Sequence, residues 1–297
     1  MENKMEEISS QRKLEALEEN GTLIRKDGKT FLQLDCENAK ELSMKWGEKL
    51  YPFTKTGKKW ILELPFSTPV NYVQICIDGQ EVLSPELPIA HGYGRPYNYI
   101  ELPDEDGLFE LRDVPHGTLT QEFYKSKISD NWEKLILYLP PCVPSAGLPV
   151  LYLQHGFGES EISWSTTGKV NLLMDNLIAA GKIKPFAIVM GNGMVKQRID
   201  GELKLNRALY GQMLVEEILP MLEKKYQFGG SKEKRGMAGL SMGSVQTTRT
   251  ICEHPELFSE VGLFSGFLRH RIVGDEEHDG IISKACEQSY LNAMDDV

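Results

Sequence analysis

The sequence predicts an α/β protein in which a small antiparallel β-sandwich precedes a parallel sheet covered by helices. Three observations lead to this prediction. Short alternating runs separated by turn residues fill the first third of the chain, apolar strands alternate with helical patterns after residue 148, and a serine flanked by glycines stands where one strand meets a helix. With 297 residues, 41% of them hydrophobic, the chain can bury the cores of one large or two modest domains.

The composition excludes several classes of partner. Asp and Glu number 43 against 33 Lys and Arg, a formal charge of -10 that disfavours a nucleic-acid partner. No apolar run reaches the ~20 residues that span a bilayer, so no membrane partner is expected. The charged start lacks the apolar core of a signal peptide, which predicts a cytoplasmic protein; a secreted protein with its signal removed is the alternative.

Five cysteines are spread along the chain without a CxxC pair. The odd number and the wide spacing argue against a disulfide framework and against a zinc ribbon. We expect reduced thiols that behave as small buried hydrophobic residues, and we expect no metal.

The chain is expected to comprise three parts. Residues 1–20 are charged helix formers in which Leu14 and Leu17 have helical spacing, which predicts an N-terminal helix or arm. Residues 21–103 are predicted to form an accessory domain, and residues 104–297 an α/β domain. The chain has no internal repeat and no low-complexity segment.

The accessory domain is predicted to be an immunoglobulin-like β-sandwich. Turn cues at Asp27-Gly28, Thr56-Gly57 and Asp78-Gly79 separate short strand-like runs. These runs are Thr30–Leu34, Glu41–Trp46, Lys59–Leu64 and Asn71–Ile77. The segment Ser84–Pro103 is rich in proline and aromatic residues and has little periodicity, so we expect a connecting segment near the domain boundary that packs against another part of the protein and is not a free linker.

The α/β domain is predicted from the alternation of strands and helices. Pro149–Gln154 and Phe186–Met190 are short, apolar strands of the kind buried on both faces, and a helical pattern at Asn171–Ala180 lies between them. Strand-like runs at Thr118–Lys127 and Lys134–Leu139 precede this alternation. The elements expected to follow are a helix at Leu209–Lys225, a strand at Lys234–Leu240, a helix at Met242–Glu253 and a strand at Glu260–Phe264.

Ser241 is the predicted nucleophile. It stands in Gly239-Leu240-Ser241-Met242-Gly243, a GxSxG motif between a predicted strand and a predicted helix. A serine on such a tight turn projects above the sheet edge, and the flanking glycines leave room for the strained backbone. The helix N-terminus behind the serine favours the negative charge that develops on an attacked carbonyl oxygen. The competing interpretation is an ordinary N-cap serine.

A second glycine-rich element, Gln154–Glu159, follows the Pro149–Gln154 strand. An acyl-transfer serine needs two backbone N–H donors, one from the residue after the serine and one from the loop after such an early strand. Met242 and Phe157 are the predicted donors, and Gly156 lets the backbone approach a substrate closely. Taken alone, the element could be a plain glycine-rich turn.

Together these motifs resemble the carbohydrate esterase family of bacterial feruloyl esterases, which is related to the esterase D group and to enterochelin esterases. The resemblance is carried by LPVLYLQHGFGE, NLLMDNLIAAGKIKPFAIVMGNG, MAGLSMGS and HPELFSEVGLFSG, in the family's order over residues 110–268. It implies an α/β-hydrolase fold, often preceded by an immunoglobulin-like domain, and a triad of Ser, Asp or Glu, and His, of which only Ser241 is assigned. The resemblance also implies Phe157 and Met242 as oxyanion positions. The predicted substrate-binding residues are His155, Gly156, Gly158 and Trp164.

This chain departs from the family's pattern in two places. Phe157 and Ser244 stand where the family more often has small residues or glycine, which is expected to reshape the acyl pocket. In this fold the acid and the histidine follow the serine on later strands, but the chain ends at Val297 without another apolar strand. We therefore expect the hydrolase part to be C-terminally short and both triad partners to be missing.

The chain's own histidines are weak substitutes for the missing base. His254 lies at the far end of the helix that starts beside Ser241, about 20 Å away at about 1.5 Å per residue. His270 and His278 could fold back over the site, against the competing interpretation of a solvated loop. His155 is expected to shape the oxyanion loop rather than to take the proton.

The favoured function is that of a serine carboxylesterase, which hydrolyses acyl esters of carbohydrates through an acyl-enzyme on Ser241. The more specific prediction is a feruloyl esterase that acts on xylan side chains. The alternatives are a siderophore esterase of the enterochelin type and a truncated or non-catalytic carbohydrate-binding relative. The substrate is then a small-molecule or oligosaccharide ester, and no cofactor is needed. Without triad partners the chain alone is expected to hydrolyse esters feebly, and Glu260–Phe264 is expected to be an unpaired edge strand that could form a homo-oligomer.

Aromatic side chains of the first half allow two interpretations. They could stack on sugars, but aromatic residues at strand spacing are more typical of packing in a core or at a domain interface. The residues concerned are Trp46, Trp60, Tyr93, Tyr97 and Tyr99.

Overall fold

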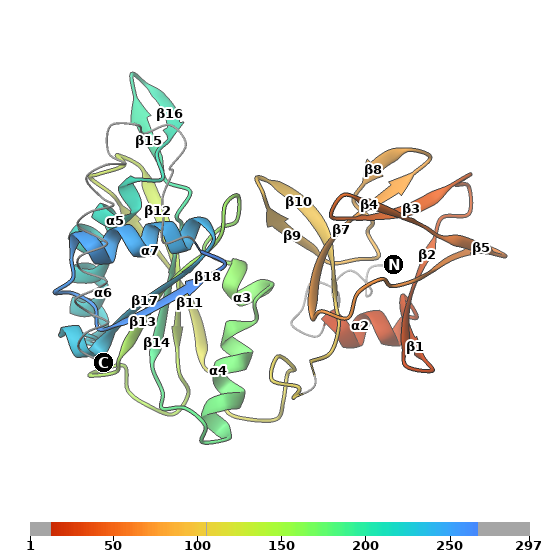
Figure 1. Ribbon diagram of the computed structural model, residues 1–297. Coiled ribbons are helices and arrows are strands. Elements are labelled where there is room, and N and C mark those ends of the chain that lie inside the picture. The colour runs from red at the N-terminus through yellow and green to blue at the C-terminus, as the bar shows by residue number, and fades with distance from the viewer. Residues whose placement is uncertain (1–12, 105, 267–297) are drawn as a thin grey trace. The chain divides into compact units, whose positions relative to one another are not determined.

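The computed structural model describes residues 13–104 and 106–266. The chain divides into two compact units, each described below by itself (Figure 1). The first comprises residues 1–113 together with 166–176, and the second comprises residues 114–165 together with 177–297. The described residues contain no helix that is long and apolar enough to cross a membrane.

Two antiparallel sheets form the body of the first unit, after a short helix, α2 (Lys13–Glu19). One sheet has the strand order β1-β2-β6-β5, and the other has the order β4-β3-β7-β10-β9 with β8 paired to β7. The predicted strand-like runs are confirmed as β2, β3, β6 and β7. The strands are β1 (Leu23–Lys26), β2 (Lys29–Asp35), β3 (Leu42–Trp46), β4 (Lys49–Pro52), β5 (Thr54–Thr56), β6 (Lys59–Glu63), β7 (Val70–Ile77), β8 (Gln80–Val82), β9 (Ile89–Gly92) and β10 (Arg95–Glu101).

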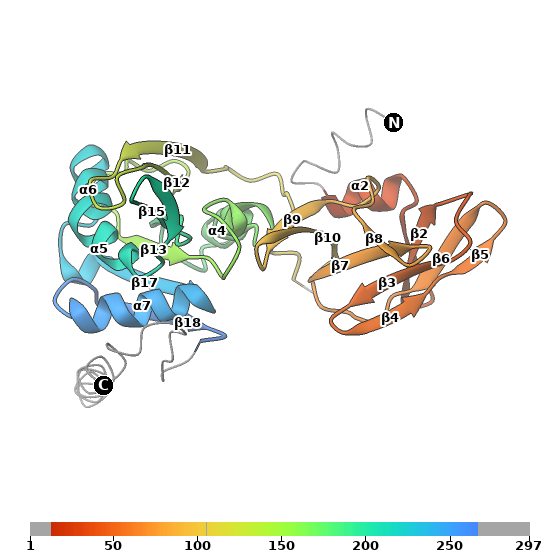
Figure 2. The same cartoon turned by 90° about the horizontal axis from the view of Figure 1, so that it is seen from above.

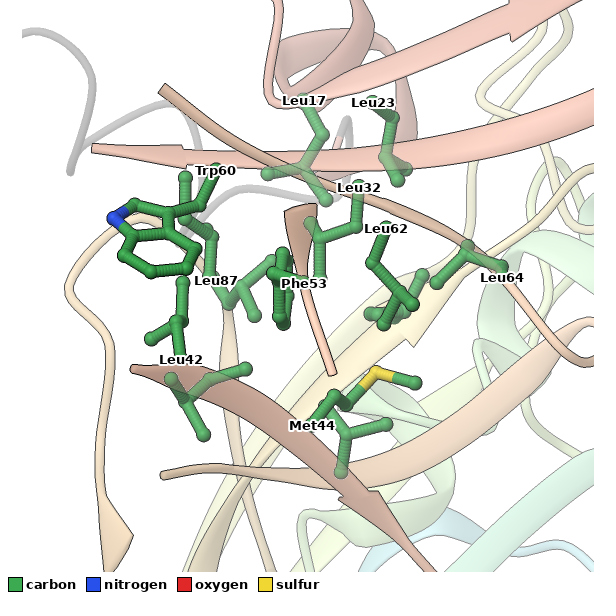
Figure 3. Close-up of a cluster of buried hydrophobic side chains, with 14 of the residues drawn as sticks. Leu17, Leu23, Leu32, Leu42, Met44, Phe53, Trp60, Leu62, Leu64 and Leu87 are labelled. Carbon is green, nitrogen blue, oxygen red and sulfur yellow. The ribbon is translucent and has the colours of Figure 1, made fainter. Parts of the chain in front are cut away.

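Both sheets of the first unit share one hydrophobic core (Figure 3). Leu32 of β2 and Met44 of β3 belong to different sheets, and both are fully buried in this cluster. Leu14 and Leu17 of α2 join it, which confirms that their helical spacing marks a buried face. Each such side chain contributes about 1.5–3 kcal/mol by leaving water, so the cluster is the main source of stability in this unit.

The segment Ser84–Pro103 is packed, as expected, but the expectation that it is a connecting segment is wrong, because most of it forms part of a sheet. It contains β9 and β10, which pair with each other, and β10 also pairs with β7. The buried side-chain amide of Asn98 donates to the carbonyl oxygens of Ser84 at 3.0 Å and Leu87 at 3.3 Å. Its side-chain oxygen accepts from the Ser84 N–H at 2.8 Å. The pairing of β10 with β7 joins residues more distant in the chain, and no local pattern reveals it.

A buried charge cluster joins separate segments of the first unit. Glu101 at the end of β10 forms an ion pair with Lys169, and both side chains are buried. Lys13 of α2 donates to the carbonyl oxygen of Thr166 at 3.2 Å. Burial lowers the pKa of Lys13 to about 8 and raises the pKa of Glu101. The cluster therefore connects residues 166–169 to α2 and β10.

A six-stranded sheet forms the body of the second unit (Figure 2). Its order is β11-β12-β14-β13-β17-β18, in which the last four strands are parallel and the first two are antiparallel. These strands and the helices α5 and α6 enclose a second hydrophobic core. The predicted strands of this sheet are confirmed, as are the helices predicted at Asn171–Ala180 and Met242–Glu253, and β18 ends the sheet as far as the described residues extend. The strands are β11 (Thr118–Lys125), β12 (Trp132–Leu139), β13 (Val150–Gln154), β14 (Ala187–Gly191), β17 (Arg235–Leu240) and β18 (Glu260–Phe264), and the helices of this part of the chain are α3 (Ser163–Thr166), α4 (Val170–Ala179), α5 (Leu209–Met213), α6 (Leu219–Tyr226) and α7 (Met242–Glu253).

The helix predicted at Leu209–Lys225 is interrupted. Between α5 and α6 the chain forms a π-helical turn at Leu214–Ile218. Pro220 at the start of α6 has no N–H to donate, so the carbonyl four residues earlier loses its α-helical partner. The sequence did not predict the hairpin of β15 (Lys196–Ile199) and β16 (Glu202–Leu205), because both strands are only four residues long and mostly exposed, although Asp200-Gly201 between them is a turn signal.

The cysteines differ from the expectation at one position. Cys36, Cys76 and Cys142 are free thiols, whereas Cys252 is disulfide-bonded. The expectation of five reduced thiols is therefore wrong at Cys252. Spacing along a sequence does not reveal which thiols a fold brings within bonding distance.

Candidate active site

Ser241 lies on the turn between β17 and α7, as predicted. Its backbone has φ 51° and ψ −110°, a conformation that a residue with a Cβ rarely adopts, and its side chain is exposed. The Ser241 N–H donates to the carbonyl oxygen of Phe264 at 2.9 Å, and its own carbonyl oxygen accepts from the Ser244 hydroxyl at 2.6 Å. The strained turn is thus held by β18 and by the first turn of α7.

The glycines of the GxSxG motif are required by close backbone contacts. A Cβ on Gly239 would lie 2.2 Å from the carbonyl carbon of Gly243. A Cβ on Gly243 would lie 2.7 Å from the carbonyl oxygen of His155 and 2.8 Å from that of Gln154. The turn that carries Ser241 therefore packs directly against the loop after β13, and the two motifs found in the sequence lie side by side.

Two backbone amides at this junction are available to an oxyanion. Met242 is the first residue of α7, where an N–H has no partner within the helix. The Phe157 N–H makes no hydrogen bond within the described residues, and 41% of the Phe157 surface is exposed. Gly156 donates its N–H to Glu159 at 2.8 Å, and Gly158 donates to the Met194 sulfur at 3.5 Å. These bonds fix the turn on both sides of Phe157.

The side chain of His155 connects the loop after β13 to the loop after β14. Its ring is 1% exposed, with Nδ1 2.8 Å from the carbonyl oxygen of Gly156 and Nε2 2.9 Å from the N–H of Gly193. Nδ1 must donate and Nε2 must accept, so the ring is neutral. Burial lowers the pKa of His155 further. The buried ring therefore bonds the backbone at Gly156 and at Gly193, and its predicted roles, shaping the oxyanion loop and binding substrate, stay predictions.

Acid is expected to weaken the fold through His155. The unfolded chain binds a proton here below the ordinary pKa of 6.5, whereas the folded chain does so only at lower pH. The stability that His155 contributes is therefore complete above that value and is lost as pH falls below it, by at most about 1.4 kcal/mol per pH unit. Urea denaturation at several pH values should show a steeper dependence for the wild type than for His155→Gln. Equal slopes would mean that the folded chain binds this proton as readily as the unfolded chain does.

Trp164 lies next to the turn that carries Ser241. Its indole N–H donates to the carbonyl oxygen of Gln154 at 2.9 Å, and its ring centroid is 6.0 Å from that of Phe264. Because Phe264 also accepts the Ser241 N–H, the structure brings Trp164, the turn and the β13 loop together. Trp164 is half-buried, so part of its ring remains accessible at this junction.

Arg207 and Gln246 are site neighbours that the sequence analysis missed. The Arg207 guanidinium lies 5.1 Å from the centroid of the Phe157 ring. The buried Gln246 side chain donates to the carbonyl oxygens of Gly193 at 2.9 Å and Arg207 at 3.0 Å. Neither residue belongs to a motif, and only the fold places Arg207 beside Phe157.

Two described histidines of the Ser241 unit, His155 and His254, are poorly placed to serve Ser241 as a base. His254 caps the far end of α7, where it lies 3.6 Å from Glu256. His155 has both ring nitrogens engaged. His270 and His278 lie outside the described residues. Within the described residues, no group of three His, Cys, Asp or Glu side chains could hold a metal ion.

Comparison with known proteins gives a family match over most of the second unit. The family model described as "Putative esterase" matches residues 126–293, a range that includes Ser241, His270 and His278. An endo-1,4-beta-xylanase/feruloyl esterase from Xylanibacter ruminicola is 36% identical over 213 residues, which are 69% of this chain and 29% of that protein. The chain thus spans less than a third of the length of this relative.

Two solved structures resemble the fold. A ferulic acid esterase from Anaeromyces mucronatus is 21% identical, with a TM-score of 0.50 over 55% of this chain and 63% of that one. The enterobactin esterase of Shigella flexneri is 11% identical, with a TM-score of 0.61 over 91% of this chain and 86% of that one. At such low identity these likenesses establish the α/β-hydrolase fold alone. The family model matches more than half of the chain, and this match shows that the chain is a member of the esterase family whose model covers residues 126–293.

Proposed function

We propose that this chain is a serine carboxylesterase that hydrolyses acyl esters of carbohydrates, with a feruloyl group on a xylan side chain as its specific substrate. The observation that carries the proposal is the exposed, strained Ser241, which stands beside the amides of Met242 and Phe157. The names of the Xylanibacter ruminicola relative and the Anaeromyces mucronatus structure support the feruloyl ester as substrate.

In the proposed reaction the Ser241 hydroxyl oxygen attacks the ester carbonyl carbon. The carbonyl oxygen becomes an oxyanion that accepts hydrogen bonds from the Met242 and Phe157 amides, and the N-terminus of α7 adds a favourable dipole. The sugar hydroxyl leaves with a proton, and water then hydrolyses the acyl-enzyme to release the acid and restore Ser241. A histidine takes and returns the proton; His270 and His278 are the two candidates that this chain offers within the matched family range.

The neighbouring residues receive separate roles in this proposal. Gly156 and Gly158 give the loop its close approach to the substrate, Trp164 borders the acyl group, and His155 positions the loop from below. We also propose that the paired sheets of the first unit form an immunoglobulin-like domain. Its predicted limits, residues 21–103 after an arm at 1–20, stay a prediction, as does the hydrolase domain at 104–297.

The test compares two kinds of ester with the purified chain. We expect release of ferulate from feruloylated arabinoxylan oligosaccharides and from methyl ferulate, detected by liquid chromatography, with negligible cleavage of enterobactin. Preferential cleavage of enterobactin would favour a siderophore esterase. No release of ferulate, together with no labelling of Ser241 by a fluorophosphonate, would contradict the proposal.

A further inference from the structure

The turn between β9 and β10 contains an unusual residue. In four two-residue hairpin turns of the described chain, both central residues have positive φ, as in type I′ turns. Three of them are Asp-Gly pairs, at residues 27–28, 78–79 and 200–201. The fourth is Tyr93-Gly94, with φ values of 52° and 81°. Asp tolerates this conformation because its short side chain bonds the nearby backbone, whereas a bulky tyrosine there is strained.

The strained tyrosine points its ring into solvent and belongs to an aromatic cluster. Tyr93 is 74% exposed, and its ring centroid lies 6.3 Å from that of Tyr97 at an angle of 72°. The Tyr97 ring lies 5.8 Å from that of Tyr72 at 64°. Tyr97 on β10 and Tyr72 on β7 share one face of the sheet, since Tyr72 is paired with Tyr99 two residues further along β10. The turn therefore holds the Tyr93 ring in a strained conformation, although this ring is not needed for packing in a buried core.

Polar groups surround these rings. The Arg95 guanidinium lies 4.5 Å from the centroid of Tyr97 and donates to Glu81 at 3.0 Å, and Gln74 also donates to Glu81. The side chains of Arg95 and Glu81 are 46% and 40% exposed. Lys45 also pairs with Glu81, at 3.4 Å, so this part of the surface offers two cationic donors around one carboxylate acceptor.

We propose that this tyrosine face, defined by Tyr72, Tyr93, Tyr97, Arg95 and Glu81, binds a neutral polysaccharide of the xylan class. Aromatic rings pack against the apolar C–H faces of sugar rings, while charged and amide groups bond the hydroxyls. Rings inclined to one another at 64° and 72° suit a chain that twists, because a flat crystalline surface would need coplanar rings. The protein's net charge of -10 disfavours acidic polysaccharides.

The choice of xylan depends on the proposed esterase function, because the polymer that binds would be the one that carries the ester. Binding itself involves the first unit and does not need Ser241. The two proposals therefore fail separately: a chain that binds xylan without hydrolysing esters contradicts only the catalytic one, and a chain that releases ferulate without binding xylan contradicts only this one.

The deciding variant is Tyr93→Asn, which removes the ring and places at this turn a residue that positive φ favours. Binding is measured in the Ser241→Ala background by calorimetry with xylohexaose and by retardation in gels that contain arabinoxylan. We expect Tyr93→Asn to weaken binding about tenfold or more, the loss of roughly one aromatic contact, while its Tm stays equal or rises. Tyr93→Phe, which keeps the ring, should bind like the parent.

Leu50→Ala is the matched control, because Leu50 is 61% exposed on β4 of the same unit, and it should bind like the parent. Absence of xylan binding in the parent, or equal binding by Tyr93→Asn, would overturn the proposal. Tighter binding to polygalacturonate than to xylan would overturn the assignment to a neutral polymer. A clear fall in Tm for Tyr93→Asn would show that the ring packs within the protein instead.

Discussion

Replacement of Ser241 by alanine is expected to lower kcat/KM toward methyl ferulate at least about a thousandfold, to the rate that the oxyanion donors alone support. The reason is that Ser241 supplies the only covalent step, whereas the amides of Met242 and Phe157 remain in place. The fold should persist, because the exposed Ser241 side chain has no packing to lose. Steady-state kinetics of both proteins, with circular dichroism to compare their folds, measures this effect.

Ser259→Ala is the control, because Ser259 is exposed in the same unit and far from the turn in sequence; its kinetics should equal those of the wild type. His270→Asn and His278→Asn are then compared with Ser241→Ala, and the base is the histidine whose loss has a similar effect. A wild-type rate within about tenfold of the Ser241→Ala rate would contradict the prediction. It would agree instead with the expectation that this chain alone is a feeble esterase without triad partners.

Glu101→Gln is expected to lower the free energy of unfolding of the first unit by about 3–5 kcal/mol. Glu101 and Lys169 are both buried, so the neutral amide leaves the Lys169 ammonium without a counter-charge and without water. Lys13, buried nearby with its pKa already lowered to about 8, adds a second positive charge that Glu101 partly offsets. Chemical denaturation, with hydrogen exchange of the β10 amides to report on this unit, measures the change.

Glu63→Gln is the matched control for this prediction. Glu63 pairs with Lys29 at 2.9 Å, but both side chains are about half exposed, so its loss should cost less than about 1 kcal/mol. The double variant Glu101→Gln/Lys169→Met should recover much of the stability, because it removes the uncompensated charge. A loss for Glu101→Gln no larger than that for Glu63→Gln would mean that Lys169 reaches water.

The candidate site was predictable where its geometry is local. Gly239, Ser241 and Gly243 identify the strand-to-helix turn from five consecutive residues, because close backbone contacts exclude every other residue at the two glycines. The Gln154–Glu159 loop lies beside this turn because each motif follows a parallel strand, and neighbouring parallel strands end at the same sheet edge. The neighbouring strands β13 and β17 end at that edge together, which is a property of parallel sheets that sequence order reveals.

By itself, then, the sequence determined the elements with their own periodicity: the apolar strands β13 and β14, the elbow at Ser241, and the alternating strands β2, β3, β6 and β7. Only the tertiary structure decided the contacts between distant residues. Examples are the pairing of β10 with β7, the partners of the His155 ring, the ion pair of Glu101 with Lys169 and the position of Arg207 beside Phe157. The physical reason is that hydrophobic periodicity follows from which face of one element is buried, whereas a buried polar side chain is stable only with a specific partner, which any part of the chain can supply.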